Sequence, residues 1–457
     1  MTALSTPHGP TGLAAEARRI ARLAWPIILT NLNWTIMHVI DVTVVGLAGT
    51  GELGALAAGR VINFVILMLL LSGMSGIVVF TSRADGGGDL PRTGSLWREA
   101  VLTGLLLGIP SALLIGFNAH AALALTGVAP ELVTPGAHVL VAMMIGLPGQ
   151  MLLIACGYFL EGVSAPRRVL VVNLATLPLN GLLAWAMTLG HFGLPAMGAF
   201  GAALATSISG TVGGLAMAAL AWTLPSAPAR GLRRLDAAAW RAALGGIPAI
   251  IRFGTMPGLG AAMEVLGFSW LMILSTRMGE VIAGGFQVMI SLHNIGFALA
   301  LGLGSAAGVR VGNAVGAGEP WMARSRTLIA CGLSLVIMGS VVLVYLLLAR
   351  PIVAGLTADA AVAREAVVML LILSPFILCD GLQAIFIAAL RSLGDQVAAG
   401  LNGIVAFFLV MSLAGWVGWR LGWGSAGLAL ACAIGMAAAM LLQGARFWVV
   451  SSRYRRS

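Results

Sequence analysis

The stretch LSGMSGIVVFTSRADGGGD (residues 71–89) recurs in diverged form as LGLGSAAGVRVGNAVGAGE (301–319), an offset of 230 residues. The matched positions include Leu71/Leu301, Ser75/Ser305, Val79/Val309, Ala84/Ala314, Gly86/Gly316 and Gly88/Gly318. Offsets of 226 and 231 likewise place GAFGAALAT (198–206) on GSAGLALAC (424–432) and Pro26 on Pro257. These offsets are close to half of the 457-residue chain. The sequence therefore predicts two related halves.

The composition is that of a membrane protein. Hydrophobic residues make up 59% of the chain, charged residues 9%, and the mean hydropathy is +1.00, whereas soluble proteins average about 25% charged residues. Apolar runs long enough to cross a bilayer predict twelve transmembrane helices. The predicted spans are 23–47, 53–81, 100–119, 133–160, 169–189, 197–224, 247–276, 282–309, 327–348, 366–390, 397–419 and 425–448.

The arginines between these spans predict the orientation. One side of the membrane, with both termini, would hold Arg18, Arg19, Arg22, Arg83, Arg92, Arg98, Arg167, Arg168, Arg230, Arg233, Arg234, Arg241, Arg310, Arg324, Arg326, Arg391, Arg446, Arg453, Arg455 and Arg456. The other side would hold Arg277, Arg350, Arg364 and Arg420. Positive residues favour the cytoplasmic side, so we expect a multi-pass protein of the bacterial inner membrane with both termini in the cytoplasm.

The repeat and the span count together predict the architecture. Six spans per half is an even number, so both halves enter the membrane in the same direction. We expect an all-α protein of two six-helix bundles related by a pseudo-two-fold axis along the membrane normal. The predicted divisions are a cytoplasmic segment 1–22, a lobe 23–224, a cytoplasmic linker 225–246 and a lobe 247–450. The linker arginines could also form an amphipathic helix at the membrane surface.

Other features exclude several classes of protein. The first 22 residues lack the apolar core of a secretory signal, so the first span should be retained. The cysteines Cys156, Cys331, Cys379 and Cys432 lie in apolar runs without metal-ligand spacing, which indicates reduced thiols. The arginines are spread between the spans, which does not favour a nucleic-acid partner. We expect a monomer in the lipid bilayer that requires no cofactor.

Three carboxylates lie well inside apolar helices, namely Asp41, Glu264 and Asp380. A charged group at the bilayer centre costs about 2.5–3.5 kcal/mol on insertion scales, so these three require an explanation. Each could hold a proton and release it when water, a cation or a cationic substrate arrives. A cation such as Na⁺ would need several oxygen ligands, to which Glu264 and Asp380 could contribute. The alternative is that each acid is protonated and only hydrogen-bonds neighbouring helices.

Several segments resemble one family of transporters. The segment GGFQVMISLHNIGFALALGLGSAAGVRVGNAVGAGEP (284–320) is similar to the eighth helix and following connection of multidrug and toxic compound extrusion (MATE) transporters, where A-x-x-V-R-V-G-N-x-x-G-A-G recurs. LAWPIILTNLNWTIMHVIDVTVVG, FLEGVSAPRRVLVVNLATLPLN, MPGLGAAMEVLGF and LILSPFILCDGLQAIFIAALRSLGDQ extend the resemblance over nearly the whole chain.

The resemblance implies a secondary active multidrug exporter, which moves organic cations or polyaromatic compounds in exchange for Na⁺ or H⁺ by alternating access. It implies that Asp41 is the first-helix aspartate of the family, concerned with protonation or substrate. Glu264 and Asp380 match the cation-coupling acids of the NorM-like branch, and Asn180 matches an asparagine that partners the first-helix aspartate. Some members carry a second aspartate where this chain has Ala184, so the C-terminal pair is favoured here for coupling.

Polar residues near that pair are candidate supporting ligands: Gln287, His293, Asn294 and Gln383. For His293, a hydrogen-bonded core histidine is the alternative to a ligand.

Three other functions are less compatible with the sequence. A flippase for lipid-linked saccharides of the same superfamily would need cavity arginines for its anionic cargo, and only Arg60 and Arg252 lie near or within spans. An enzyme is not expected, because no nucleophile or His/Asp constellation accompanies the acids. A channel is not favoured, because no selectivity loop is repeated.

Overall fold

The computed structural model describes residues 12–234 and 236–454, and in this part of the chain every regular element is a helix. Twelve of its helical segments are long and apolar enough to span a membrane. The all-α class and the span count are thus confirmed. Residues 1–11 of the predicted N-terminal segment, as well as Arg455 and Arg456, lie outside the described residues.

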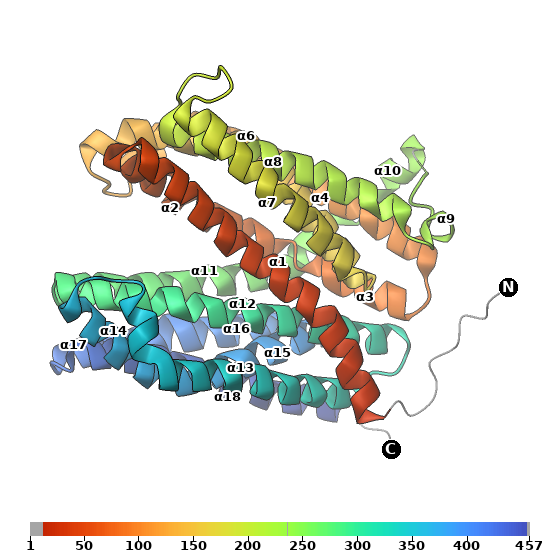
Figure 1. Ribbon diagram of the computed structural model, residues 1–457. Coiled ribbons are helices and arrows are strands. Elements are labelled where there is room, and N and C mark those ends of the chain that lie inside the picture. Colours follow the sequence, from red (N-terminus) through yellow and green to blue (C-terminus); the bar gives the residue numbers. More distant parts are fainter. Residues whose placement is uncertain (1–11, 235, 455–457) are drawn as a thin grey trace.

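The helices form two bundles, one above the other in Figure 1. The upper bundle contains α1 (Leu13–Ala48), α2 (Thr50–Gly73), α3 (Gly76–Gly86), α4 (Leu90–Phe117), α5 (Ala119–Ala124), α6 (Pro130–Gly162), α7 (Pro166–Leu189), α8 (Gly198–Leu220) and the 3-10 turn η1 (Ala221–Thr223). The linker carries α9 (Ala227–Arg230) and α10 (Ala237–Leu244). The lower bundle contains α11 (Ile247–Arg277), α12 (Glu280–Gly316), α13 (Met322–Ala354), α14 (Ala360–Leu373), η2 (Ser374–Phe376), α15 (Ile377–Leu393), α16 (Gln396–Gly403), the π-helix η3 (Ile404–Met411), α17 (Ser412–Arg420) and α18 (Gly424–Ser452).

Most helices extend beyond the predicted apolar spans. The predicted span 23–47 lies within α1, and the predicted span 282–309 lies within α12, which continues to Gly316. Backbone hydrogen bonding continues through polar residues such as Arg310 and Asn313 that interrupt the apolar run, which hydropathy alone does not detect. The predicted span 366–390 is interrupted by η2 around Pro375, because proline cannot donate the hydrogen bond of a regular helix.

Each bundle has its own apolar core, but α1 contributes to both. Val45 belongs to the core of the upper bundle, whereas Ile20, Ala24 and Ile27 pack with residues of α12, α13 and α15. Figure 1 shows α1 crossing from one bundle to the other. The predicted lobe divisions stay a prediction, and α1 connects the two sides of that division.

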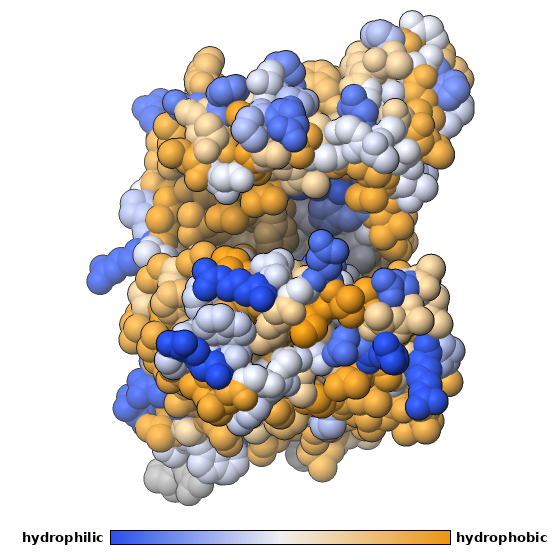
Figure 2. Space-filling model, turned by 90° about the vertical axis from the view of Figure 1, so that its left-hand side faces the viewer, coloured by the Kyte–Doolittle hydropathy of each residue, from blue (hydrophilic) through white to orange (hydrophobic). Residues whose placement is uncertain are grey.

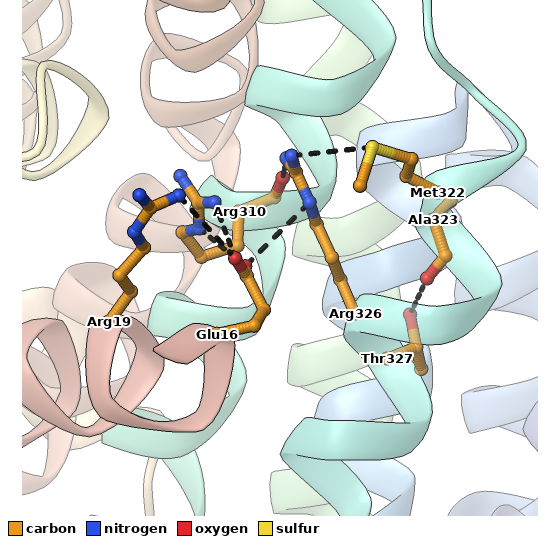
Figure 3. A network of polar contacts seen from close by, with 7 residues as sticks. All are labelled: Glu16, Arg19, Arg310, Met322, Ala323, Arg326 and Thr327. Atoms are coloured by element: carbon orange, nitrogen blue, oxygen red, sulfur yellow. Dashed lines mark hydrogen bonds and ion pairs between the residues drawn. The ribbon is translucent and has the colours of Figure 1, made fainter. Parts of the chain in front are cut away.

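A buried charge network anchors the lower end of α1. The guanidinium of Arg310 donates two hydrogen bonds to the Glu16 carboxylate, at 2.7 and 2.8 Å. Arg326 lies 3.6 Å from the same carboxylate and donates to the backbone carbonyl of Arg310 (Figure 3). Glu16 lies outside the predicted span 23–47, yet it is buried in α1. Its pairing explains why the carboxylate is tolerated there.

The two bundles meet tightly at the end where the described chain begins and ends. Asn313 Nδ2 donates to the Ser82 carbonyl at 2.8 Å, and Arg83 donates to the Ser392 carbonyl at 3.0 and 3.2 Å. At Gly312 and Gly316 a side chain would overlap Ser82 and the Arg83 carbonyl, respectively. Small residues therefore permit close backbone approach here, as small-residue interfaces do in other membrane helices. At the opposite end, a hollow separates the bundles (Figure 2).

Candidate functional site

Asp380 lies at the centre of a buried polar cluster in the lower bundle. It belongs to the first turn of α15, immediately after the break at η2. Gln383 Nε2 donates a hydrogen bond to Asp380 Oδ1 at 3.1 Å, and His293 Nε2 of α12 lies 3.3 Å from Asp380 Oδ2. The break around Pro375 thus restarts the helix where it presents Asp380 to α12. The structure thus brings Asp380, Gln383 and His293 into one polar cluster.

The surroundings of this cluster are apolar. The His293 ring stacks on Phe268 with centroids 5.8 Å apart and lies 6.1 Å from the ring of Phe297. His293 and Asp380 are both buried. His293 is therefore a hydrogen-bonded core histidine that also touches a candidate coupling carboxylate. A core position and a supporting role beside Asp380 are thus compatible for His293.

Glu264 lies on α11, seven residues beyond Pro257, and is partly exposed. Its carboxyl group is within electrostatic range of Asp380 and of Arg391, which lies in the last turn of α15. Two neighbouring carboxylates favour binding of a proton or a cation, because either reduces their mutual repulsion. Arg391 was assigned to a connection, but it lies within α15 and takes part in this electrostatic environment.

Asp41 has a different environment. Its Oδ2 atom accepts a hydrogen bond from Arg60 of α2 at 2.6 Å and one from the Thr206 hydroxyl of α8 at 3.1 Å. Asn180 donates to Thr206 at 3.0 Å. Asp41 is therefore not an unpaired acid, because Arg60 supplies its counter-charge. Hydropathy could not show this, since the pairing depends on how α1 and α2 are rotated about their axes.

Ala184 occupies the position at which some members of the family carry a second aspartate. It is fully buried against Met187 and Ala205. The polar cluster of the upper bundle thus consists of one carboxylate, one guanidinium, one hydroxyl and one amide, namely Asp41, Arg60, Thr206 and Asn180. The charges of Asp41 and Arg60 neutralise each other, whereas Glu264 and Asp380 in the lower bundle are both acids.

Two of the predicted supporting residues lie apart from the Asp380 cluster. Gln287 and Asn294 are exposed on α12, and neither side chain forms a hydrogen bond with another residue in the ranges 12–234 and 236–454. Over these same ranges, no three His, Cys, Asp or Glu side chains gather as metal ligands. A cation at Glu264 and Asp380 would thus need further oxygen ligands, such as amides, carbonyls or water.

Like Glu16, Glu161 is a buried acid between the bundles that sequence reasoning missed. Glu161 was placed at a span end, but it lies within α6 and is only 7% exposed. It accepts a hydrogen bond at 2.8 Å from Ser305 of α12. The FLEG sequence, which continues the apolar run of the span up to Glu161, was the available signal.

Comparisons with known proteins agree with this architecture. The MatE family matches residues 26–186 and 258–416. A probable multidrug resistance protein NorM of Xanthomonas campestris is 29% identical over 98% of this chain and 97% of its own length. The multidrug resistance protein PmpM of Pseudomonas aeruginosa is 28% identical over 84% of this chain and 80% of its own length.

Solved structures show the same fold. The eukaryotic MATE transporter AtDTX14 superposes with a TM-score of 0.85 over 97% of this chain and 99% of its own, at 21% identity. A multidrug resistance MATE transporter described in an outward-facing conformation gives a TM-score of 0.86 over 97% of both chains, at 18% identity.

Proposed function

Since this chain belongs to the MatE family and is a transporter, not an enzyme, we propose that it exports organic cations or polyaromatic compounds in exchange for Na⁺ or H⁺. The names of its curated relatives, multidrug resistance proteins NorM and PmpM, support drug export. The ion-coupling part is supported by the placement of Glu264 of α11 within electrostatic range of Asp380, which is buried in α15. Asp41, paired with Arg60, would serve the cargo or the upper bundle's structure instead.

Exchange follows from competition between ion and cargo. Ion binding at Glu264 and Asp380 and cargo binding in the cleft would favour different arrangements of the two bundles. The tight contact at the arginine-rich end and the hollow at the other correspond to an outward-facing state, if the arginine-rich end is cytoplasmic (Figure 2). Labelling of single cysteines added at each terminus in intact and permeabilised cells tests this orientation. Labelling of both termini in intact cells would contradict it.

A lipid-linked saccharide flippase fits less well. Its anionic cargo would require free positive charge in the cleft. Arg60 is paired with Asp41, and Arg252 lies on an outer groove. Neither Arg60 nor Arg252 therefore offers an unpaired positive charge to a cargo in the cleft.

The decisive experiment uses proteoliposomes of the purified protein and a fluorescent organic cation. Flux is followed under an imposed Na⁺ gradient and, separately, under an imposed pH gradient, with Asp380→Asn as the inactive variant. Flux under one gradient that disappears in the variant establishes exchange and identifies the ion. Absence of flux under both gradients, across several organic cations, would contradict the proposal, and lipid-linked substrates would be tested next.

A further inference from the structure

An apolar groove lies on the outer surface where the upper bundle, the linker and the lower bundle meet. It has a volume of about 520 Å³ and is lined by Leu106 of α4, Leu244 of α10 and Ile247, Pro248, Ile251, Arg252 and Thr255 of α11. Leu106 and Leu244 are 51% and 52% exposed. The volume falls within the usual range of ligand pockets, about 300–1,000 Å³. The groove therefore has the size and lining of a binding site for an apolar chain.

The only charged residue in this lining is Arg252, and it is exposed. Within the described ranges, Arg252 forms no ion pair or hydrogen bond through its side chain. Arg241, three residues before Leu244 on α10, is exposed and equally without such a partner in these ranges. The nearest acid along the linker, Asp236, caps α10 by accepting a hydrogen bond from the Ala239 amide at 2.5 Å. Glu99 of α4 lies against Gly246 beside the groove, but its carboxylate is paired with Arg92. The groove thus combines an apolar floor with positive charge that is not ion-paired within the described ranges.

The position of α10 beside the groove is fixed by local structure. Trp240 packs edge-on against Trp97 of α4, with ring centroids 5.7 Å apart. Gly245 and Gly246 separate α10 from α11, and at Gly246 an added Cβ would overlap the Glu99 carboxylate of α4. This arrangement places α10 against α4 at the arginine-rich end of the molecule (Figure 1). Of the linker arginines, Arg241 lies on α10, Arg230 lies on α9, and Arg233 and Arg234 lie between these two helices.

We propose that this groove binds an anionic phospholipid. One acyl chain would lie along Leu106, Ile247 and Ile251, and Arg252 in the same lining would hold the phosphate. Arg241, exposed on α10 one helical turn before Leu244, would be the second cation. At 1.5 Å per residue, Arg252 is about 8 Å from the start of α11, a depth suited to the boundary between head groups and acyl chains. Basic pockets between transmembrane helices on the cytoplasmic side are a recurrent type of site for anionic lipids.

The groove is bounded by both bundles, since α4 belongs to the upper and α11 to the lower. A lipid seated there would favour the arrangement of bundles in which the groove exists. This consequence for transport rests on the proposed function, whereas lipid binding does not.

Native mass spectrometry of the detergent-purified protein tests the site without substrate or ion gradient. The probes are phosphatidylglycerol and phosphatidylcholine with identical acyl chains. The expected result is about a ten-fold preference for phosphatidylglycerol, which the double variant Arg252→Gln/Arg241→Gln loses. Arg277→Gln, at the opposite end of α11, is the matched control and should retain it.

Ile251→Trp fills the groove and should reduce binding of both lipids, while thermal unfolding checks that each variant is folded. Equal retention of the two lipids by the unmodified protein would overturn the proposal. So would the same loss of preference in Arg277→Gln. Because no transport is measured, failure of this inference is separable from failure of the exporter proposal.

Discussion

Ser82 lies directly against Gly312, the residue that the internal repeat aligns with it, 230 positions along the chain. On either side, Gly86 faces the backbone of Asn313, and Gly316 faces the carbonyl of Arg83. The repeat aligns Arg83 with Asn313 and Gly86 with Gly316. The rotation that exchanges the two repeated segments therefore also exchanges these two contacts. Reciprocal contacts of this kind define a two-fold interface. The pseudo-two-fold axis therefore passes beside Ser82 and Gly312.

Gly316→Ala should disfavour the closed contact between the bundles. The added methyl group would meet the Arg83 carbonyl, and overpacking of this kind costs about 1–3 kcal/mol. Each 1.4 kcal/mol corresponds to about a ten-fold change in the population of the closed contact. The readout is the labelling rate of the thiol introduced by Ser82→Cys in a chain without other cysteines, because Ser82 lies in the contact against Gly312 and is fully buried. Labelling should accelerate.

The matched control is Gly339→Ala on α13, where an added Cβ would meet nothing within 4 Å. It should leave the labelling rate unchanged. If both variants label at the parental rate, the contact at Gly316 does not control closure.

Arg60→Gln should destabilise the protein strongly. It would leave the Asp41 carboxylate buried without its counter-charge, and breaking a buried pair from one side costs about 3–5 kcal/mol. The melting temperature in detergent measures the loss. The double variant Arg60→Gln/Asp41→Asn should recover part of it, because the unpaired charge is also removed. A double variant less stable than Arg60→Gln would show that the pair is not the source of the effect.

Gln383→Leu should impair ion coupling specifically. It removes the hydrogen bond that Gln383 donates to Asp380, and hydrogen bonds to charged groups contribute about 1.5–3 kcal/mol. We expect about a ten-fold change in the apparent affinity for the coupling ion in gradient-driven transport. The control Asn294→Leu alters an exposed residue of α12 and should change the apparent ion affinity by less than about two-fold. Equal effects in the two variants would remove Gln383 from the site.

Arg310→Lys tests the network that anchors α1. Lysine keeps the charge but cannot form the paired hydrogen bonds that Arg310 donates to Glu16. The loss of stability should be about 1–3 kcal/mol, the usual cost of leaving a buried acceptor unsatisfied. Thermal unfolding should show a lower midpoint than for Arg22→Lys, an exposed control on α1. Identical midpoints would mean that the paired hydrogen bonds from Arg310 do not contribute to stability beyond the charge that lysine retains.

Much of the architecture could be predicted from the sequence, because the signals are local or additive. Twelve apolar runs were recognised from hydropathy alone, since each needs only enough length to cross the hydrocarbon core. The repeat at 71–89 and 301–319 predicted two related halves, and these two segments do meet at the axis. The cost of a buried charge singled out Asp41, Glu264 and Asp380 without any knowledge of their neighbours.

Only the tertiary structure decided which polar groups meet. The pairing of Asp41 with Arg60, of Asp380 with His293 and of Glu161 with Ser305 depends on the rotation and tilt of each helix. In a soluble helix an apolar stripe identifies the inward face, but here nearly every face is apolar, so the sequence carries no such stripe. The physical reason is the solvent: lipid tails and protein interior are equally apolar, and hydropathy cannot tell one from the other.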